Sequence, residues 1–171
     1  MTNKEFFIQT WQNEIPHTLS AVNGLPEDMQ KLDYRCNEKS RSAHEIIGHM
    51  LSHAEALSNA VDTNIANEKS GKKFESIQEA AAYFEKHATE LAEKLTAVDE
   101  KTWDGQIVEF QVDGNKIFAA PMRNLFWDFM FDIIHHRGQL STYYRQMGVR
   151  NPNIYGPTAD EKKKKKIINI L

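Results

Sequence analysis

Apolar residues recur every three or four positions along four stretches of the chain, which is the spacing that places them on one face of an α-helix. The first stretch covers about residues 3–22 and contains Pro16. Proline lacks the backbone N–H and clashes with the preceding turn, so Pro16 should kink or split this helix. A polar link, at about residues 27–40, separates it from the next stretch.

The second and third helices begin at sequences of the form Ser-x-x-Glu, which are typical of capping boxes. The second helix starts at Ser42 and should continue to about Asn67, before the turn at residues 70–73. The third starts at Ser76 and carries apolar residues on one face as far as Leu95.

Residues 106–119 have a different pattern, because β-branched and aromatic side chains alternate with polar ones around an Asp113-Gly114 turn. This pattern predicts a short hairpin or an extended crossover. Pro121 then suits the first turn of a fourth helix, which should end at Gly148. The order of elements predicts an all-α fold, a four-helix bundle with a long crossover before the last helix. We expect one domain at residues 1–161, followed by a lysine-rich tail at residues 162–171.

The composition is that of an ordinary globular protein, with 171 residues, 40% of them apolar and 26% charged. The net charge of −3 argues against nucleic-acid binding, which needs a basic face. No apolar run approaches the roughly 20 residues that span a bilayer, and the first residues lack the apolar core of a signal peptide. The single cysteine, Cys36, excludes an intramolecular disulfide, so we expect a cytoplasmic protein.

The fourth helix carries two residues that interrupt its apolar face. His136 falls inside the apolar stripe, and Asp132 lies on its edge one turn earlier. A carboxylate that faces a bundle interior is costly unless it is paired or bound to a metal ion. Asp132 and His136 could therefore bind one cation together, or they could form a simple charge-assisted pair, or Asp132 could pair with an arginine or lysine of another helix. Gln139 shares this side and could orient a ligand, while Arg137 on the other edge suits a structural ion pair.

The second helix offers three histidines, His44, His49 and His53. His49 and His53 are one turn apart on the flank of the apolar stripe, and periodicity alone slightly favours His53. Trp127 and Phe131 form a second apolar face on the fourth helix, opposite Asp132 and His136. Either residues 106–119 or a second subunit in a homodimer would cover that face.

The sequence His-His-Arg-Gly-Gln-Leu-Ser at residues 135–141, with residues 144–149 after it, is similar to the last-helix signature of the DinB / YfiT-like metalloenzyme family. Residues 154–161 resemble the usual end of one branch, and residues 41–50 resemble the second-helix motif. The resemblance covers about residues 6–161.

The resemblance implies an up-down-down-up bundle that holds one divalent metal ion, with zinc or nickel favoured and iron or manganese as alternatives. In the family, one histidine of the second helix and two of the fourth bind the metal. Carried over by position, the ligands here are His49, Asp132 and His136, with Gln139 beside them. Asp132 stands where the family usually has histidine.

The implied activity is metal-dependent transfer of a low-molecular-weight thiol, or hydrolysis of a small amide or ester. A thiol or an amide is then the substrate. The alternative is a non-catalytic, stress-associated protein that binds metal or dimerises. No P-loop, nucleophile elbow or Cys-x-x-Cys motif supports another enzyme class. The five lysines from Lys162 are most simply a solvated tail.

Overall fold

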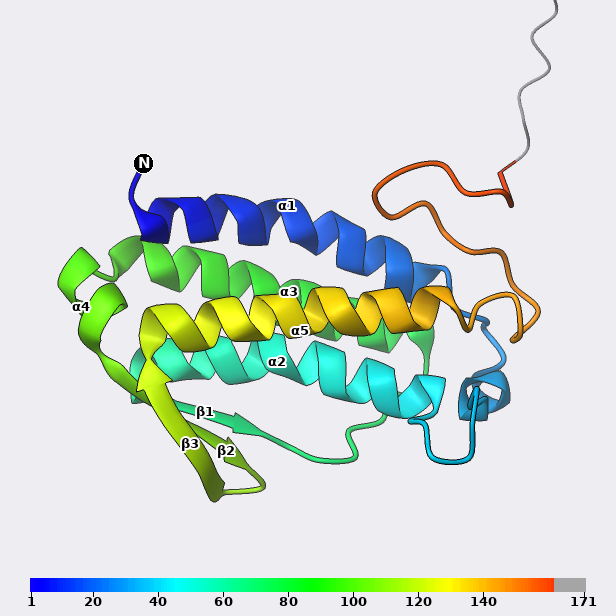
Figure 1. Ribbon diagram of the computed structural model, residues 1–171, viewed down its shortest axis with the longest axis horizontal. Coiled ribbons are helices and arrows are strands. Elements are labelled where there is room, and N and C mark those ends of the chain that lie inside the picture. The colour runs from blue at the N-terminus through cyan, green and yellow to red at the C-terminus, as the bar shows by residue number, and fades with distance from the viewer. Residues whose placement is uncertain (162–171) are drawn as a thin grey trace, which may run out of the picture.

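The computed structural model describes residues 1–161. Four long helices and one short one account for most of this part, together with a 3₁₀ helix and three strands (Figure 1). In chain order the elements are α1 (Asn3–Asn23), η1 (Met29–Asp33), α2 (Ala43–Thr63), β1 (Ile65–Glu68), α3 (Ile77–Ala97), α4 (Glu100–Gly105), β2 (Ile107–Val112), β3 (Asn115–Pro121) and α5 (Met122–Ser141).

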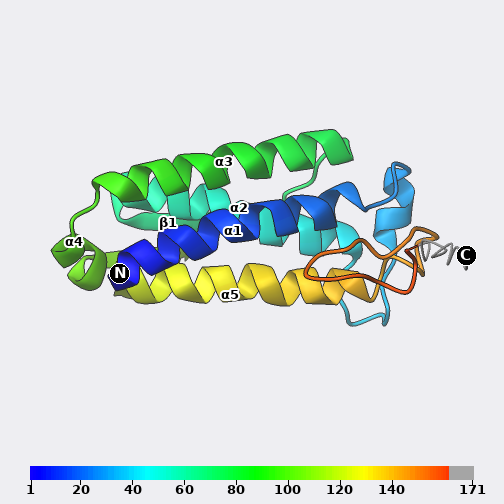
Figure 2. The same cartoon turned by 90° about the horizontal axis from the view of Figure 1, so that it is seen from above.

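The four long helices lie side by side, as the two perpendicular views show (Figures 1 and 2). Helices α2 and α3 run in the same direction, and α1 and α5 run in the opposite one (Figure 1). Because α2 and α3 are parallel, residues 64–76 must return along the molecule between them. The connection that runs the length of the helices therefore precedes α3, whereas the sequence had suggested a crossover before the last helix.

The described residues are mostly helical, as expected, but they also form a small three-stranded sheet, which is more than the hairpin that the sequence predicted. The strand order of the sheet is β1-β2-β3, with β1 parallel to β2 and β2 antiparallel to β3. The hairpin expected at residues 106–119 is confirmed, and its two turn residues, Asp113 and Gly114, have φ angles of 52° and 80°. Positive φ at both positions is the requirement of a type I′ hairpin turn, and Asp-Gly meets it.

The second helix ends earlier than its pattern suggested. It stops at Thr63, and Asn64 caps it in the left-handed conformation with φ of 58°. Ile65–Glu68, expected at least in part to continue this helix, instead forms β1. The capping box at its start is present, because the Ser42 side chain accepts from the Glu45 N–H and the Glu45 carboxylate accepts from the Ser42 N–H.

The other helix limits also differ in part from expectation. Helix α1 passes through Pro16 without being split. Helix α5 stops at Ser141, and hydrogen-bonded turns lead from there to Gly148, which has a φ of 81°. Pro121 is the last residue of β3 and immediately precedes α5, so it is not in the first helical turn.

The core lies between the long helices and is rich in aromatic residues. Phe7 of α1 is fully buried, with ring centroids 5.1 Å from Trp103 and 6.0 Å from Phe126. The face of α5 that carries Trp127 is not covered by the hairpin. Trp127 packs on Phe7, 5.2 Å away, and Phe131 is 58% exposed.

No helix of residues 1–161 is both long and apolar enough to cross a membrane. The lysine-rich tail expected at residues 162–171 lies outside the described residues.

Candidate metal centre

Four polar side chains from α2 and α5 meet between the two helices. His49 and His53 stand one turn apart on α2, and Asp132 and His136 stand one turn apart on α5. The Asp132 Oδ2 atom lies 3.2 Å from His49 Nε2, 2.7 Å from His53 Nε2 and 3.2 Å from His136 Nε2. Three imidazoles thus direct the same ring atom at one carboxylate oxygen.

The opposite ring nitrogens of these histidines are engaged by acceptors. Glu68, at the end of β1, contacts the Nδ1 atom of His53 with one oxygen and lies 3.4 Å from the Nδ1 atom of His49 with the other. Gln139 Oε1 lies 2.7 Å from His136 Nδ1. An acceptor at Nδ1 keeps the proton on that atom, and the Nε2 lone pair is then free to bind a metal ion.

The side chains form two overlapping groups that could hold a metal ion. The ligand atoms of His49, Asp132 and His136 lie within 4.8 Å of one another, and those of His49, His53 and Glu68 do the same. Imidazole nitrogen and carboxylate oxygen are common donors for divalent transition metals. The donor types and the engaged Nδ1 atoms fit a divalent ion, and His49 belongs to both groups.

The carboxylates stabilise positive charge at this centre. Burial acts to lower the pKa of His49, but its hydrogen bonds to Asp132 and Glu68 outweigh that effect and raise the pKa to about 9. Burial also opposes ionisation of the two carboxyl groups. Their hydrogen bonds to the histidines nevertheless hold the pKa values of Asp132 and Glu68 below the ordinary range.

The centre is reachable from outside. The His53, Glu68 and His136 side chains are buried, whereas that of Asp132 is 39% exposed and that of His49 is 27% exposed. A cavity of about 580 Å³ borders His49 and Glu68. A second cavity, of about 750 Å³, borders His136 and Gln139.

The structure separates the remaining residues singled out in the sequence. Arg137 is buried and forms an ion pair with Glu14 of α1, as expected for a structural role. His135 is exposed and its Nε2 atom accepts a hydrogen bond from Gln139. His44 lines the first cavity but belongs to neither of the two ligand groups.

Glu68 is the member of the centre that the sequence did not reveal. It was expected near the end of the second helix, where a glutamate is an ordinary surface residue. The buried positions of β1 are Ala66 and Glu68. Because one of these is a charged residue, apolar and polar residues do not alternate along this short strand. The signal available was Asn64, a residue type that tolerates the left-handed conformation at which helices end.

Fold and site together describe a helical protein with a histidine and carboxylate centre between two of its long helices. The profile of the DinB family matches residues 1–167, and the chain belongs to that family. The fold is similar to a DinB-like protein of Bacillus subtilis, with a TM-score of 0.63 and 20% identity over 89% of this chain and 99% of that one.

A DinB-like protein of Bacillus cereus is similar in the same way, with a TM-score of 0.66 and 19% identity over 88% of this chain and 97% of that one. At these identities the likeness concerns the fold alone. No functionally curated protein matches the chain.

Proposed function

We propose that this protein is an enzyme that depends on one divalent metal ion, held by His49, Asp132 and His136. The observation that supports the proposal is the convergence of imidazole Nε2 atoms on the Asp132 carboxylate, with the Nδ1 atoms engaged by Glu68 and Gln139. Metal-binding histidines typically donate a hydrogen bond from the other ring nitrogen to such an acceptor. Zinc and nickel suit the two nitrogens and one oxygen best, and iron or manganese is the alternative.

The residues around the centre have separable roles in this proposal. Glu68 holds His49 in place, and Gln139 does the same for His136. Three protein ligands leave a coordination position open, as in catalytic sites, and the exposed edge of Asp132 leaves access to it. A divalent ion bound there would lower the pKa of a bound water or thiol towards neutrality.

Two reactions suit such a centre: transfer of a low-molecular-weight thiol to an electrophile, or hydrolysis of a small amide or ester. We favour the thiol transfer, because neither Asp132 nor Glu68, the carboxylates that contact the histidines, is free to act as a general base. Asp132 contacts three imidazoles, and Glu68 contacts two. A thiol with an ionised sulfur needs no such base.

A second candidate is a non-catalytic protein that binds metal or forms a homodimer. The observation that favours dimer formation is a row of aromatic side chains on the surface. Phe6 is 51% exposed and Phe131 is 58% exposed, and both rings pack against Trp127. The mass in solution, measured by light scattering, separates a dimer from a monomer.

The first experiment is the metal content of protein purified without chelator or affinity tag. We expect close to one ion per chain in the wild type, and its loss in His49→Ala, Asp132→Ala and His136→Ala. His17→Ala, which removes a histidine outside both ligand groups, is the matched control and should keep the metal. Retention of the ion in His49→Ala but not in His53→Ala would replace His49 by His53 in the ligand set.

The second experiment separates the two reactions. Metal-loaded protein is incubated with a low-molecular-weight thiol and an electrophile, and the loss of free thiol is followed. The same protein is given a small ester without thiol. Metal-dependent thiol consumption supports transfer, and ester hydrolysis alone would replace it. A protein that binds metal but catalyses neither reaction favours the non-catalytic candidate.

A further inference from the structure

Arg41 places a positive charge beside the centre. It lies in the loop before α2, and its Nη1 atom is 3.5 Å from His136 Nε2. That contact is the only hydrogen bond of the Arg41 guanidinium among residues 1–161. Arginine has five N–H donors, so most of its donors are left for another group. Arg41 also lines the cavity beside His49 and the cavity beside His136.

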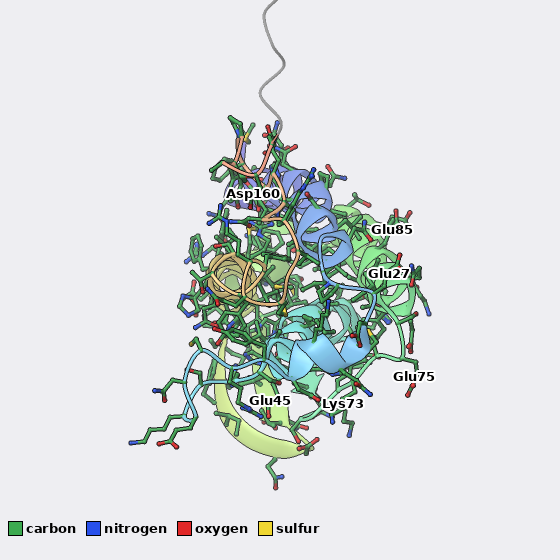
Figure 3. All side chains as sticks on the ribbon, turned by 90° about the vertical axis from the view of Figure 1, so that its right-hand side faces the viewer. Glu27, Glu45, Lys73, Glu75, Glu85 and Asp160 are labelled. Atoms are coloured by element: carbon green, nitrogen blue, oxygen red, sulfur yellow. The ribbon has the colours of Figure 1, made fainter. Side chains whose placement is uncertain are left out.

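The cavity next to His49 has an excess of unpaired positive charge. It is lined by six cationic side chains, Arg35, Lys39, Arg41, Lys69, Lys72 and Lys73. Arg35 is paired with Glu45 at 2.7 Å, and Lys72 is paired with Glu55 at 3.5 Å. Within the described part of the chain the other four form no ion pair, and of the lining carboxylates only Glu38 is unengaged. Figure 3 looks onto the end of the molecule at which α2 begins, and Glu45 and Lys73 are labelled there.

With an ion bound at the centre, the position of Arg41 would be unfavourable unless something lay between the two positive charges. His136 Nε2 is the atom that would bind the ion, so a guanidinium 3.5 Å from it faces a second cation at close range. Two like charges a few ångströms apart repel each other, and more strongly where solvent is partly excluded. An anionic group placed between them would turn this repulsion into two attractions.

We propose that the cavity between Arg41 and His49 binds a small molecule through an oxyanion, a carboxylate or a phosphate, whose charge is shared by Arg41 and the centre. The guanidinium matches either oxyanion with two parallel hydrogen bonds. Lys39, Lys69 and Lys73 attract the anion at the rim of the cavity. The inference names the substrate class of the proposed enzyme, and in that respect it rests on the proposed function.

The test measures anion binding to metal-free and to metal-loaded protein, so that the contribution of Arg41 is separated from that of the ion. Calorimetric titrations at fixed ionic strength use succinate, inorganic phosphate and the neutral analogue succinamide. We expect one saturable site for succinate or phosphate, and none for succinamide. The tighter of the two anions identifies the oxyanion. Absence of saturable binding for both anions would overturn the inference.

The variants separate a built site from general attraction. Arg41→Gln should weaken anion binding at least tenfold. Arg41→Lys should recover part of that loss, because lysine keeps the positive charge but lacks the two parallel N–H donors of the guanidinium. Arg150→Gln removes an exposed arginine that lines neither cavity, and it should change binding less than twofold. Equal weakening by Arg41→Gln and Arg150→Gln would contradict the proposed site.

The metal content of each variant keeps the two proposals apart. Arg41→Gln should retain the ion, because Arg41 is not one of its ligands. A wild type that binds no metal but binds the anion through Arg41 would support this inference and defeat the proposed function. A wild type that binds metal but binds no anion, either before or after the metal is added, would support the proposed function and overturn this inference.

Discussion

Arg137 and His136 are neighbours on α5, and both are buried, yet their surroundings differ. Arg137 donates from Nη1 to the Thr18 hydroxyl at 3.0 Å and to the Glu14 carbonyl oxygen at 3.3 Å. Its Nη2 atom donates to the Glu14 carboxylate and to the Tyr155 hydroxyl. One positive charge therefore meets one negative charge, and nearly every donor has an acceptor from the same chain.

His136 belongs to a cluster in which hydrogen-bond donors and acceptors are not matched one to one. Its Nε2 atom shares Asp132 Oδ2 with the Nε2 atoms of His49 and His53. Three ring nitrogens and a carboxylate thus face one point, with access from two cavities. Burial of a charged residue does not distinguish a structural network from a site. What distinguishes them is whether donors and acceptors are already matched within the chain.

The largest effect should come from breaking the matched network. Arg137→Met leaves the Glu14 carboxylate without its partner, and removal of one member of a buried ion pair costs about 3–5 kcal/mol of unfolding free energy. Urea unfolding of metal-free protein measures this loss. His136→Ala should cost less stability but remove the metal, whereas Arg137→Met should keep the metal wherever it stays folded. Loss of the metal in folded Arg137→Met, together with a larger loss of stability in His136→Ala, would contradict the roles given to these two neighbours.

Gly48 tests how the centre is closed on the side of β1. A Cβ atom at this position of α2 would overlap the carbonyl oxygen of Lys72. Gly48→Ala should therefore displace the loop that follows Glu68, at a cost of about 1–3 kcal/mol. The matched control is Gly138→Ala on α5, where a Cβ atom meets nothing within 4 Å.

Alanine is the better helix former, so Gly138→Ala should stabilise the protein by about 0.5–1 kcal/mol. Thermal unfolding compares the two variants. If Gly48→Ala proves as stable as the wild type, the loop does not press on α2 as described.

Glu68 tests the contacts that orient the ligands. Glu68→Gln removes the charge that engages both α2 histidines, so metal affinity should fall about 10- to 100-fold. Competition with a chromophoric chelator measures the affinity. Glu85→Gln, an equal change of charge at an exposed position of α3, should leave it unchanged. Equal affinities for the two variants would mean that Glu68 does not support the centre.

Glu45 provides the smallest effect, because its pair with Arg35 is matched but exposed. The Arg35 guanidinium and the Ser42 N–H lower the pKa of Glu45 to about 2 from an ordinary value of 4.5. A lowered carboxyl pKa stabilises the fold above pH 4.5, and that contribution is lost as the pH falls towards 2.

Glu45→Gln should therefore cost no more than about 1 kcal/mol at pH 7, since solvent screens an exposed pair. The difference from the wild type should shrink between pH 4.5 and pH 3 in urea unfolding. A difference that is independent of pH would assign the effect to the helix cap and not to the charge.

The four long helices could be predicted because their apolar residues repeat with the helical period and two of them begin at Ser-x-x-Glu. The capping box is complete at Ser42, whereas at Ser76 only the serine side chain accepts, from the Glu79 N–H. The hairpin could be predicted because Asp113-Gly114 suits only a few turns. The strand β1 could not, since it has four residues and pairs with β2, which lies about forty residues away in the sequence. The long return between α2 and α3 went unrecognised for the same reason.

Asp132 and His136 could be found because they interrupt an apolar stripe. The choice between His49 and His53 could not be made from periodicity, since both lie on the flank of α2. The structure places both at Asp132 and groups His49 with Asp132 and His136. Glu68 required the fold, because it reaches the centre from a strand and not from a helix.

The most direct test of the metal centre is the position of an ion in a crystal of the protein grown or soaked with zinc. Anomalous diffraction at the zinc absorption edge locates it. We predict one peak between α2 and α5, about 2.0–2.2 Å from His49 Nε2, His136 Nε2 and an Asp132 carboxylate oxygen. A peak bound by His49, His53 and Glu68, or no peak between the two helices, would contradict the ligand set proposed here.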